Sequence, residues 1–135
     1  MDFNIPEELI LEKIFIVKNE HSAQHLGSGK LAVLSTPSMI LFMENVTRLC
    51  TEKVLPEGFT TVGTKVCISH LAAAPLGAKI LTTTKLIEHI ERKLTFTVIA
   101  WWEEIKIGEG SHERFIINSK RFLERLKEKL HQSNS

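Results

Sequence analysis

Residues 36–54, TPSMILFMENVTRLCTEKV, have the pattern of an apolar helix that carries one carboxylate, Glu44, near its middle. At about 100° per residue, most of its apolar side chains fall on one broad stripe, and the others are spread over the remaining circumference. Pro37 suits the first helical position, and Thr36 just before it is a permitted N-cap. The pattern predicts a helix wrapped by other structure, in which the Glu44 carboxylate needs a partner or a chemical role.

The composition of the 135-residue chain is that of one globular domain, which we expect to span residues 1–135. A formal net charge of +1 gives no electrostatic reason to expect a nucleic-acid partner. No apolar run approaches the roughly 20 residues that span a bilayer, and the acidic N-terminus lacks the basic region of a secretory signal. We therefore expect no membrane partner and a cytoplasmic protein. Cys50 and Cys67 lie inside apolar runs, so we expect two reduced core thiols and no metal site.

Strand patterns lie on both sides of the helix. The segment before it is rich in β-branched residues, and a polar, glycine-containing loop at residues 19–30 separates the two. After the helix, an alternation of period two begins at Val62 and ends at His70. The expected strands cover residues 9–18, 62–70, 79–90, 93–102 and 105–117. A charged helix with a narrow apolar stripe is expected to follow Asn118, its N-cap.

This order of elements, a strand, a buried helix and four strands in a meander, favours an α+β fold. The helix is the long apolar element available to cover one face of the sheet, so a curved antiparallel sheet wrapped around it is the natural packing. Such a sheet leaves an open edge, which a chain of this length protects best by pairing with a second copy. We therefore expect a homodimer.

Three residue types in the chain suit acyl transfer, which needs a nucleophile or water activator, a base and a proton donor. Glu44 is the first candidate; its alternative role is an i,i+4 ion pair with Arg48. His70 ends a strand, and its alternative role is that of a satisfied core histidine. Thr36 lies at the positive end of the helix, where it either caps the helix or takes part in chemistry.

His112 and Arg114 share one parity of the last predicted strand, which follows Gly108 and Gly110. This pattern is also typical of a solvated edge that bends at its glycines. The chain contains no serine-nucleophile elbow, phosphate-binding loop or dinucleotide-binding turn, and no Cys/His cluster that favours zinc.

Three stretches of the chain resemble the fluoroacetyl-CoA thioesterase family of hot-dog-fold proteins: STPSMILFMENV (35–46), GTKVCISHLAAAPLG (63–77) and IGEGSHERFIIN (107–118). They keep the family's order and spacing, and the similarity runs over roughly residues 8–130. The resemblance implies the hot-dog fold, an acyl-CoA substrate, and a homodimer or a dimer of dimers. It implies no cofactor, because CoA is part of the substrate.

The resemblance also implies roles for single residues. Thr36, Glu44 and His70 match the family's catalytic triad, in which the Glu attacks the thioester carbonyl or activates water. The Thr hydroxyl helps to hold that carboxylate, and the His acts as general acid and base. Gly63 matches a glycine whose backbone lies against the thioester, and Arg114 matches an arginine that orients an active-site carboxylate.

The chain departs from the family at residues 27–36, GSGKLAVLST, which lack the aromatic residues that fluoroacetyl-selective members place near the start of the helix. A short or medium acyl chain is therefore the expected substrate group. Two alternatives stay open from the sequence. One is a non-catalytic hot-dog protein that binds acyl-CoA or another small ligand. The other is an enoyl-CoA hydratase or dehydratase, which usually has an Asp/His pair at the helix entrance, whereas Asp2 is the only aspartate here.

Overall fold

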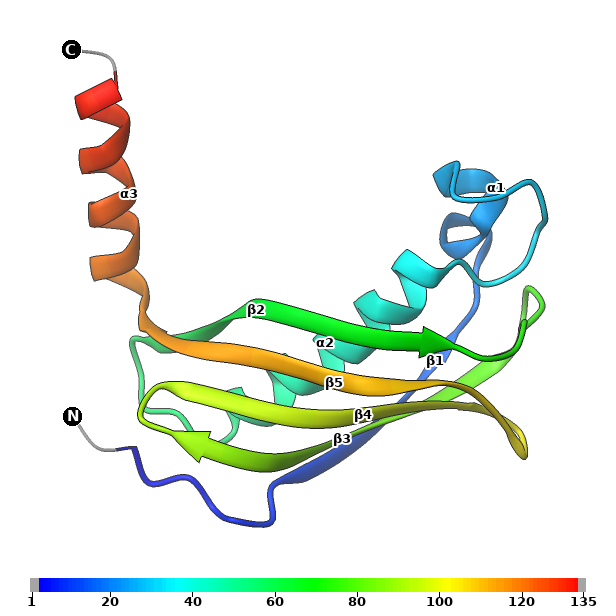
Figure 1. Cartoon of the computed structure of the whole chain (residues 1–135), viewed down its shortest axis with the longest axis horizontal. Helices are drawn as coiled ribbons and strands as arrows, with labels where there is room; N and C mark the ends of the chain where they lie inside the picture. Colours follow the sequence, from blue (N-terminus) through cyan, green and yellow to red (C-terminus); the bar gives the residue numbers. More distant parts are fainter. Residues whose placement is uncertain (1–2, 134–135) are drawn as a thin grey trace.

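Five antiparallel strands form one curved sheet, and a long helix lies against one of its faces (Figure 1). The computed structural model describes residues 3–133. The strands are β1 (Ile10–Ile16), β2 (Phe59–His70), β3 (Lys79–Ile90), β4 (Lys93–Trp102) and β5 (Ile105–Asn118). The helices are η1 (Asn19–His21), α1 (Ala23–Leu26), α2 (Thr36–Glu52) and α3 (Ser119–Ser133). The predicted α+β hot-dog arrangement is confirmed, with α2 as its central helix; η1 and α1 lie in the segment predicted as a loop.

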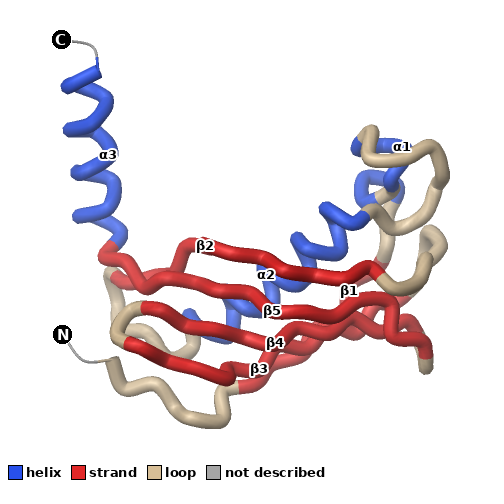
Figure 2. Tube along the Cα trace, in the orientation of Figure 1, coloured by secondary structure: helices blue, strands red, loops and turns tan. Residues whose placement is uncertain are grey.

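The order of strands in the sheet is β1-β3-β4-β5-β2. The predicted meander is correct for β3, β4 and β5, which are joined by tight turns at Glu91 and Glu103, both with φ 54°. It is wrong for β2, which pairs with β5 and not with β3 (Figure 2). Alternation within a strand fixes its faces but not its neighbours, so the sequence did not reveal this crossing. As a result, β1 and β2 are the two edge strands.

A β-bulge in β2 breaks the alternation predicted for that strand. Gly63 pairs with Arg114, whereas Lys65 pairs with the preceding residue of β5, Glu113, so Thr64 is an extra residue. Because directly opposed residues share a face of the sheet, the residues after the bulge change sides relative to those before it. Gly63 and His70 therefore both lie on the α2 side, although the sequence placed them on opposite parities.

The core lies between α2 and the inner face of the sheet. Its fully buried members include Met39, Met43, Ile80, Val98 and Ile107. The other side of α2 is open, and Leu41 is exposed there, so the predicted wrapping holds for one side of the helix only. Cys50 is buried as predicted, but Cys67 is exposed because it follows the bulge and points away from α2.

Candidate active site

Thr36 is the first residue of α2, and its hydroxyl reaches the histidine that ends β2. Ser35 is the N-cap of the helix, and its side chain accepts a hydrogen bond from the backbone N–H of Ser38. The prediction that Thr36 caps the helix is therefore wrong; both residues are permitted caps, and Ser35 occupies the position. Thr36 Oγ1 instead shares a hydrogen bond of 2.7 Å with Nδ1 of His70.

The imidazole of His70 has one partnered nitrogen and one without a partner. Its Nε2 is buried and has no hydrogen-bond partner among the described residues, so His70 is not a satisfied core histidine. Burial lowers the pKa of His70 from its ordinary value of 6.5, and the backbone of Ala72 offsets part of that shift. A neutral imidazole that contacts a hydroxyl is suited to general acid–base chemistry.

Glu44 lies two turns further along α2 and faces a different set of residues. Its Oε2 is 3.9 Å from Nη1 of Arg114, and its side chain is 39% exposed. The alternative ion pair between Glu44 and Arg48 is wrong, because Arg48 binds Glu52 at 2.8 Å, one turn further on. The Glu44 carboxylate is therefore open to solvent on one side and lies near a buried cation on the other.

Three hydrogen bonds hold the Arg114 guanidinium in the interior. Its Nε donates to Oγ1 of Thr61 at 2.7 Å, and its Nη2 donates to the Thr61 carbonyl at 2.9 Å. Its Nη1 donates to Nε2 of His112 at 3.1 Å. Arg114 and His112 are only 5% and 1% exposed. The alternative prediction that they lie on a solvated edge strand is wrong, because β5 lies between β4 and β2.

The hydrogen bonds of His112 also define where its proton lies. The Lys65 carbonyl is only an acceptor, so Nδ1 carries the proton and donates it over 2.9 Å. Arg114 is only a donor, so Nε2 is bare and the ring is neutral. Burial is the main cause that lowers the pKa of His112. The hydrogen bond to the Lys65 carbonyl offsets part of that shift, the Arg114 charge lowers the pKa further, and Glu44 and Glu113 raise it by less. Neutral His112 thus keeps Arg114 directed toward Glu44.

Gly63 leaves space beside the carboxylate. A Cβ at this position would lie 3.1 Å from Glu44 Oε2, 3.3 Å from His112 Cε1 and 3.4 Å from Arg114 Nη1. A side chain would therefore compete with any group that approaches Glu44 along the strand. This position suits the substrate-contacting role implied by the resemblance.

The five predicted site residues form two groups in one chain. Thr36 and His70 make the first group, and Glu44, Gly63 and Arg114 make the second. Eight residues of helix separate Thr36 from Glu44, which is about 12 Å along the axis. Among the described residues, no hydrogen bond or ion pair joins the two groups. Within one chain, the hydrogen bonds and ion pairs of the described residues therefore do not connect the three predicted catalytic side chains.

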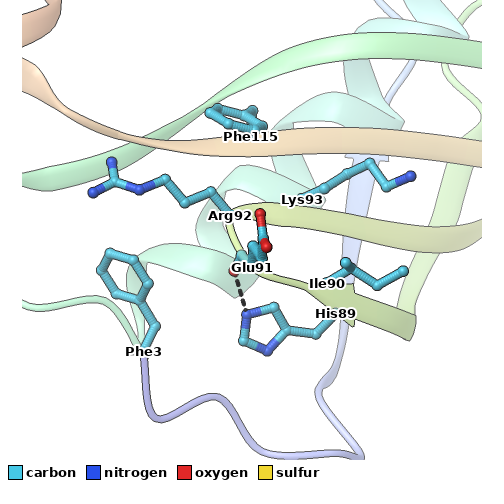
Figure 3. Close-up of a pocket in the computed structure, with 7 residues that line it drawn as sticks. All are labelled: Phe3, His89, Ile90, Glu91, Arg92, Lys93 and Phe115. Atoms are coloured by element: carbon cyan, nitrogen blue, oxygen red, sulfur yellow. Dashed lines mark hydrogen bonds between the residues drawn. The ribbon is translucent and has the colours of Figure 1, made fainter. Parts of the chain in front are cut away.

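A hollow of about 750 Å³ lies apart from both groups, at the turn between β3 and β4 (Figure 3). It is lined by Phe3, His89, Ile90, Glu91, Arg92, Lys93 and Phe115. In it, His89 is hydrogen-bonded to the carbonyl of Glu91 at 2.8 Å, and the lining offers no hydroxyl or thiol nucleophile. Size alone therefore does not make this hollow a candidate for acyl transfer.

Residues 3–133 lack two features. No group of three or more His, Cys, Asp or Glu side chains there is placed to hold a metal ion. In the same part of the chain, no helix combines the length and the apolar character needed to span a membrane.

Sequence reasoning gave no role to Thr61 or His112, which hold Arg114 in place. The spacing of His112 and Arg114 on one strand face was a usable signal, because two such residues contact the same neighbours. Thr61 carried no such signal. It lies before the strand start predicted at Val62, and its contact with Arg114 depends on the pairing of β2 with β5.

Comparisons with known proteins cover the same residues. The family model for fluoroacetyl-CoA-specific thioesterases matches residues 17–120, a range that includes all five predicted site residues. The fluoroacetyl-CoA thioesterase of Streptantibioticus cattleyicolor is 31% identical to this chain over 121 residues, which make up 85% of this chain and 87% of that protein.

Solved structures show the same arrangement of elements. A structure of the fluoroacetyl-CoA thioesterase FlK matches with a TM-score of 0.86 and 26% identity, and the match covers 93% of this chain and 98% of that one. A variant of FlK in complex with fluoroacetate and CoA matches with a TM-score of 0.82 and 27% identity, over 87% of this chain and 99% of that one.

Proposed function

The chain belongs to the family of fluoroacetyl-CoA-specific thioesterases and is an acyl-CoA thioesterase, and we propose that it hydrolyses a short or medium acyl-CoA with Thr36, Glu44 and His70. The observation that carries this proposal is the 2.7 Å hydrogen bond between Thr36 and His70. It joins a hydroxyl to an imidazole whose other nitrogen has no partner within residues 3–133, which is the arrangement that acid–base catalysis needs.

In the proposed reaction, acyl-CoA and water give a carboxylic acid and free CoA. Glu44 takes a proton from the water whose oxygen attacks the thioester carbonyl carbon. Protonated Glu44 passes its proton to neutral His70, and the imidazolium so formed protonates the leaving thiolate as the C–S bond breaks, which returns both side chains to their starting states. Arg114 keeps the Glu44 carboxylate in place, and Gly63 leaves room for the thioester. The reaction uses no cofactor beyond the CoA of the substrate.

A homodimer would complete this site. β2 is the longer of the two edge strands, with 12 residues against 7 in β1, and it carries both Gly63 and His70. If two copies of β2 pair antiparallel about a two-fold axis at Cys67, the extra residue of the bulge places Gly63 opposite His70 of the second copy. The Thr36–His70 pair of one copy would then lie beside Glu44 of the other.

The acyl group is proposed from the start of α2. Residues 27–36 contain no aromatic side chain, and Leu31 among them is exposed. A site without an aromatic cover on this side has less reason to distinguish a fluorinated acetyl group from another short chain. We therefore expect hydrolysis of several short and medium acyl-CoAs.

The test is hydrolysis of a panel of acyl-CoAs, including fluoroacetyl-CoA, by the purified full chain. Glu44→Ala and His70→Ala should abolish turnover, and Glu52→Ala on the same helix is the matched control, because Glu52 forms its ion pair with exposed Arg48. Wild-type turnover no faster than that of the two site variants on every substrate would refute the proposal. Tight acyl-CoA binding in calorimetry without turnover would identify a binding protein instead.

A further inference from the structure

Helix α3 carries an uncovered apolar stripe. At about 100° per residue, Phe122, Leu123 and Leu126 fall within one arc of the helix. These side chains are 43%, 54% and 48% exposed, although they are large apolar groups in a segment rich in charged residues. A helix of 15 residues has marginal stability in water unless such a face is packed, so the stripe calls for a partner.

The position of α3 indicates where that partner lies. The helix follows β5 directly, and the backbone N–H of Ser119 donates to the carbonyl of Gly58 just before β2. From there α3 passes the free edge of β2 and stands clear of the sheet (Figure 1). The helix and the unpaired edge strand therefore border the same region outside the chain, and a second copy paired through β2 would fill it.

Strand pairing specifies the part of the second copy that α3 would meet. In the proposed register, the beginning of one β2 lies beside the residues that follow the other β2. At that end of the second copy lie the β2–β3 connection, with exposed Leu71 and Leu76, and the β4–β5 turn with exposed Ile105. A helix of about 22 Å spans roughly four strands spaced about 4.8 Å apart, so α3 is long enough to reach from one to the other.

The charges of the two surfaces are complementary. α3 contains Lys120, Arg121, Arg125, Lys127 and Lys129 against Glu124 and Glu128. The β4–β5 turn presents two adjacent carboxylates, Glu103 and Glu104, which are both exposed. A basic helix with an apolar stripe thus matches a surface of exposed leucines bordered by acids.

We propose that α3 docks through Phe122, Leu123 and Leu126 onto the β2–β3 connection and the β4–β5 turn of a second copy of this chain. This inference rests on the homodimer of the proposed function. The helix then contacts the partner beside its Thr36–His70 pair, and it enlarges an interface that strand pairing alone would leave small.

The first experiment compares two double variants of the full chain by sedimentation velocity. Phe122→Ser with Leu126→Ser removes the stripe, and Glu124→Ser with Glu128→Ser changes the opposite face of the same helix. We expect the first to weaken dimerisation by on the order of a hundredfold or more, since two large apolar groups per chain lose their burial. The second should leave the dissociation constant unchanged. Equal dimer affinity in both variants would overturn the proposal.

The second experiment locates the docking surface with single reactive cysteines in a Cys67→Ser background. One chain carries Leu123→Cys on α3, and the other carries Glu104→Cys on the β4–β5 turn. A short bis-maleimide should join the mixed chains, whereas Glu128→Cys on the opposite face should give little product with the same partner. Equal yields from the two helix positions would overturn the proposal.

The outcomes also separate this inference from the proposed function. A wild-type dimer that fails to hydrolyse any acyl-CoA, but is weakened by the stripe variant, supports α3 docking and refutes the thioesterase site. An active dimer that both double variants leave intact refutes docking alone. A wild-type chain that stays monomeric at all concentrations refutes docking, and the hydrolysis assay then decides the activity by itself.

Discussion

The two groups of candidate residues differ in how tightly they are held. Thr36 is exposed, and His70 has one hydrogen-bonded nitrogen and one without a partner among the described residues. In the other group, Arg114 and His112 are buried, and each nitrogen of the His112 ring has a partner. The first group is suited to move protons, and the second is suited to keep a carboxylate in one place. The predictions below test this division of labour.

The largest effect is expected from Glu44→Gln, which keeps the shape of the side chain but removes its charge. Loss of the proton acceptor should lower kcat by about a thousandfold. Thermal stability should change little, because the carboxylate is partly exposed and its nearest cation is 3.9 Å away. Turnover and thermal denaturation are measured on the same samples, with Glu52→Gln as the control. A large fall in melting temperature with kcat retained would instead make Glu44 a structural residue.

That contrast also marks where sequence reasoning succeeded. The apolar helix, the strands and the meander of β3 to β5 follow from periodicity and turn residues, which are local properties. Ser35 and Thr36 are both good caps before Pro37, so sequence did not decide which hydroxyl would be free. The bulge after Gly63 and the pairing of β2 with β5 depend on distant contacts, and they decide which side chains face α2.

The candidate site shows the same limit. Residue type and position singled out Thr36, Glu44 and His70, and a resemblance added Gly63 and the role of Arg114. A resemblance records only where residues stand in the sequence. It does not record that Arg48 prefers Glu52, or that His112 is buried beside Arg114. Both facts arise from packing between α2, β2 and β5. The two-turn separation of Thr36 from Glu44 follows from helix geometry alone, whereas the different partners of the two residues depend on tertiary packing.

The second-largest effect on activity is expected from Arg114→Lys, which tests the buried guanidinium that lies beside Glu44. An ammonium keeps the charge but cannot reproduce the fork that binds Thr61 twice and His112 once. Glu44 then loses its fixed neighbour, and we expect kcat to fall by roughly tenfold to a hundredfold. Unlike Glu44→Gln, this variant should also be less stable, by about 1–3 kcal/mol, because buried acceptors lose their donors. Chemical denaturation beside the kinetic assay measures both; unchanged stability would contradict the rigid role.

A smaller effect is expected from Gly63→Ala. The added methyl would lie 3.1 Å from Glu44 Oε2, so the carboxylate or the substrate must move by a few tenths of an ångström. We expect a decrease in kcat/KM of about tenfold, since the backbone at Gly63 has no positive φ and the fold should tolerate alanine. Thr64→Ala, at the neighbouring bulge residue, is the control. Equal kcat/KM in both variants would mean that no substrate group passes Gly63.

The pH dependence should separate the two histidines. Burial lowers the pKa of both His70 and His112 from 6.5, so the unfolded chain binds more protons than the folded chain as pH falls below that value. The contribution of the two histidines to the free energy of unfolding should therefore be present in full above about pH 6.5. It should be lost progressively as the pH falls toward the lowered folded-state pKa values. His112→Gln, measured by denaturant titration at several pH values, should reduce this slope.

The rate profile should respond differently from the stability profile. Its acid limb should lie below pH 6.5, because His70 stays neutral to lower pH than an exposed histidine. His112→Gln should lower the plateau and leave the position of the limb unchanged, since His112 acts through Arg114. If the acid limb moves in His112→Gln, the proton transfer would be assigned to His112 and not to His70.

The last prediction concerns the proposed pairing of two β2 strands, which would bring the two groups of candidate residues together across a dimer. It is measured by crosslinking and not by the rate of hydrolysis. A two-fold axis at Cys67 places the two copies of this exposed thiol on directly opposed residues, whose Cα atoms are about 4.5–5.5 Å apart in antiparallel pairs. A short bis-maleimide should therefore join wild-type chains through Cys67 and leave Cys67→Ser chains unjoined. Cys50 gives the internal control, because burial raises its pKa to about 11 and keeps the thiol protonated and unreactive. Crosslinking absent in a confirmed dimer would exclude this register, and with it the route by which His70 of one copy reaches Glu44 of the other.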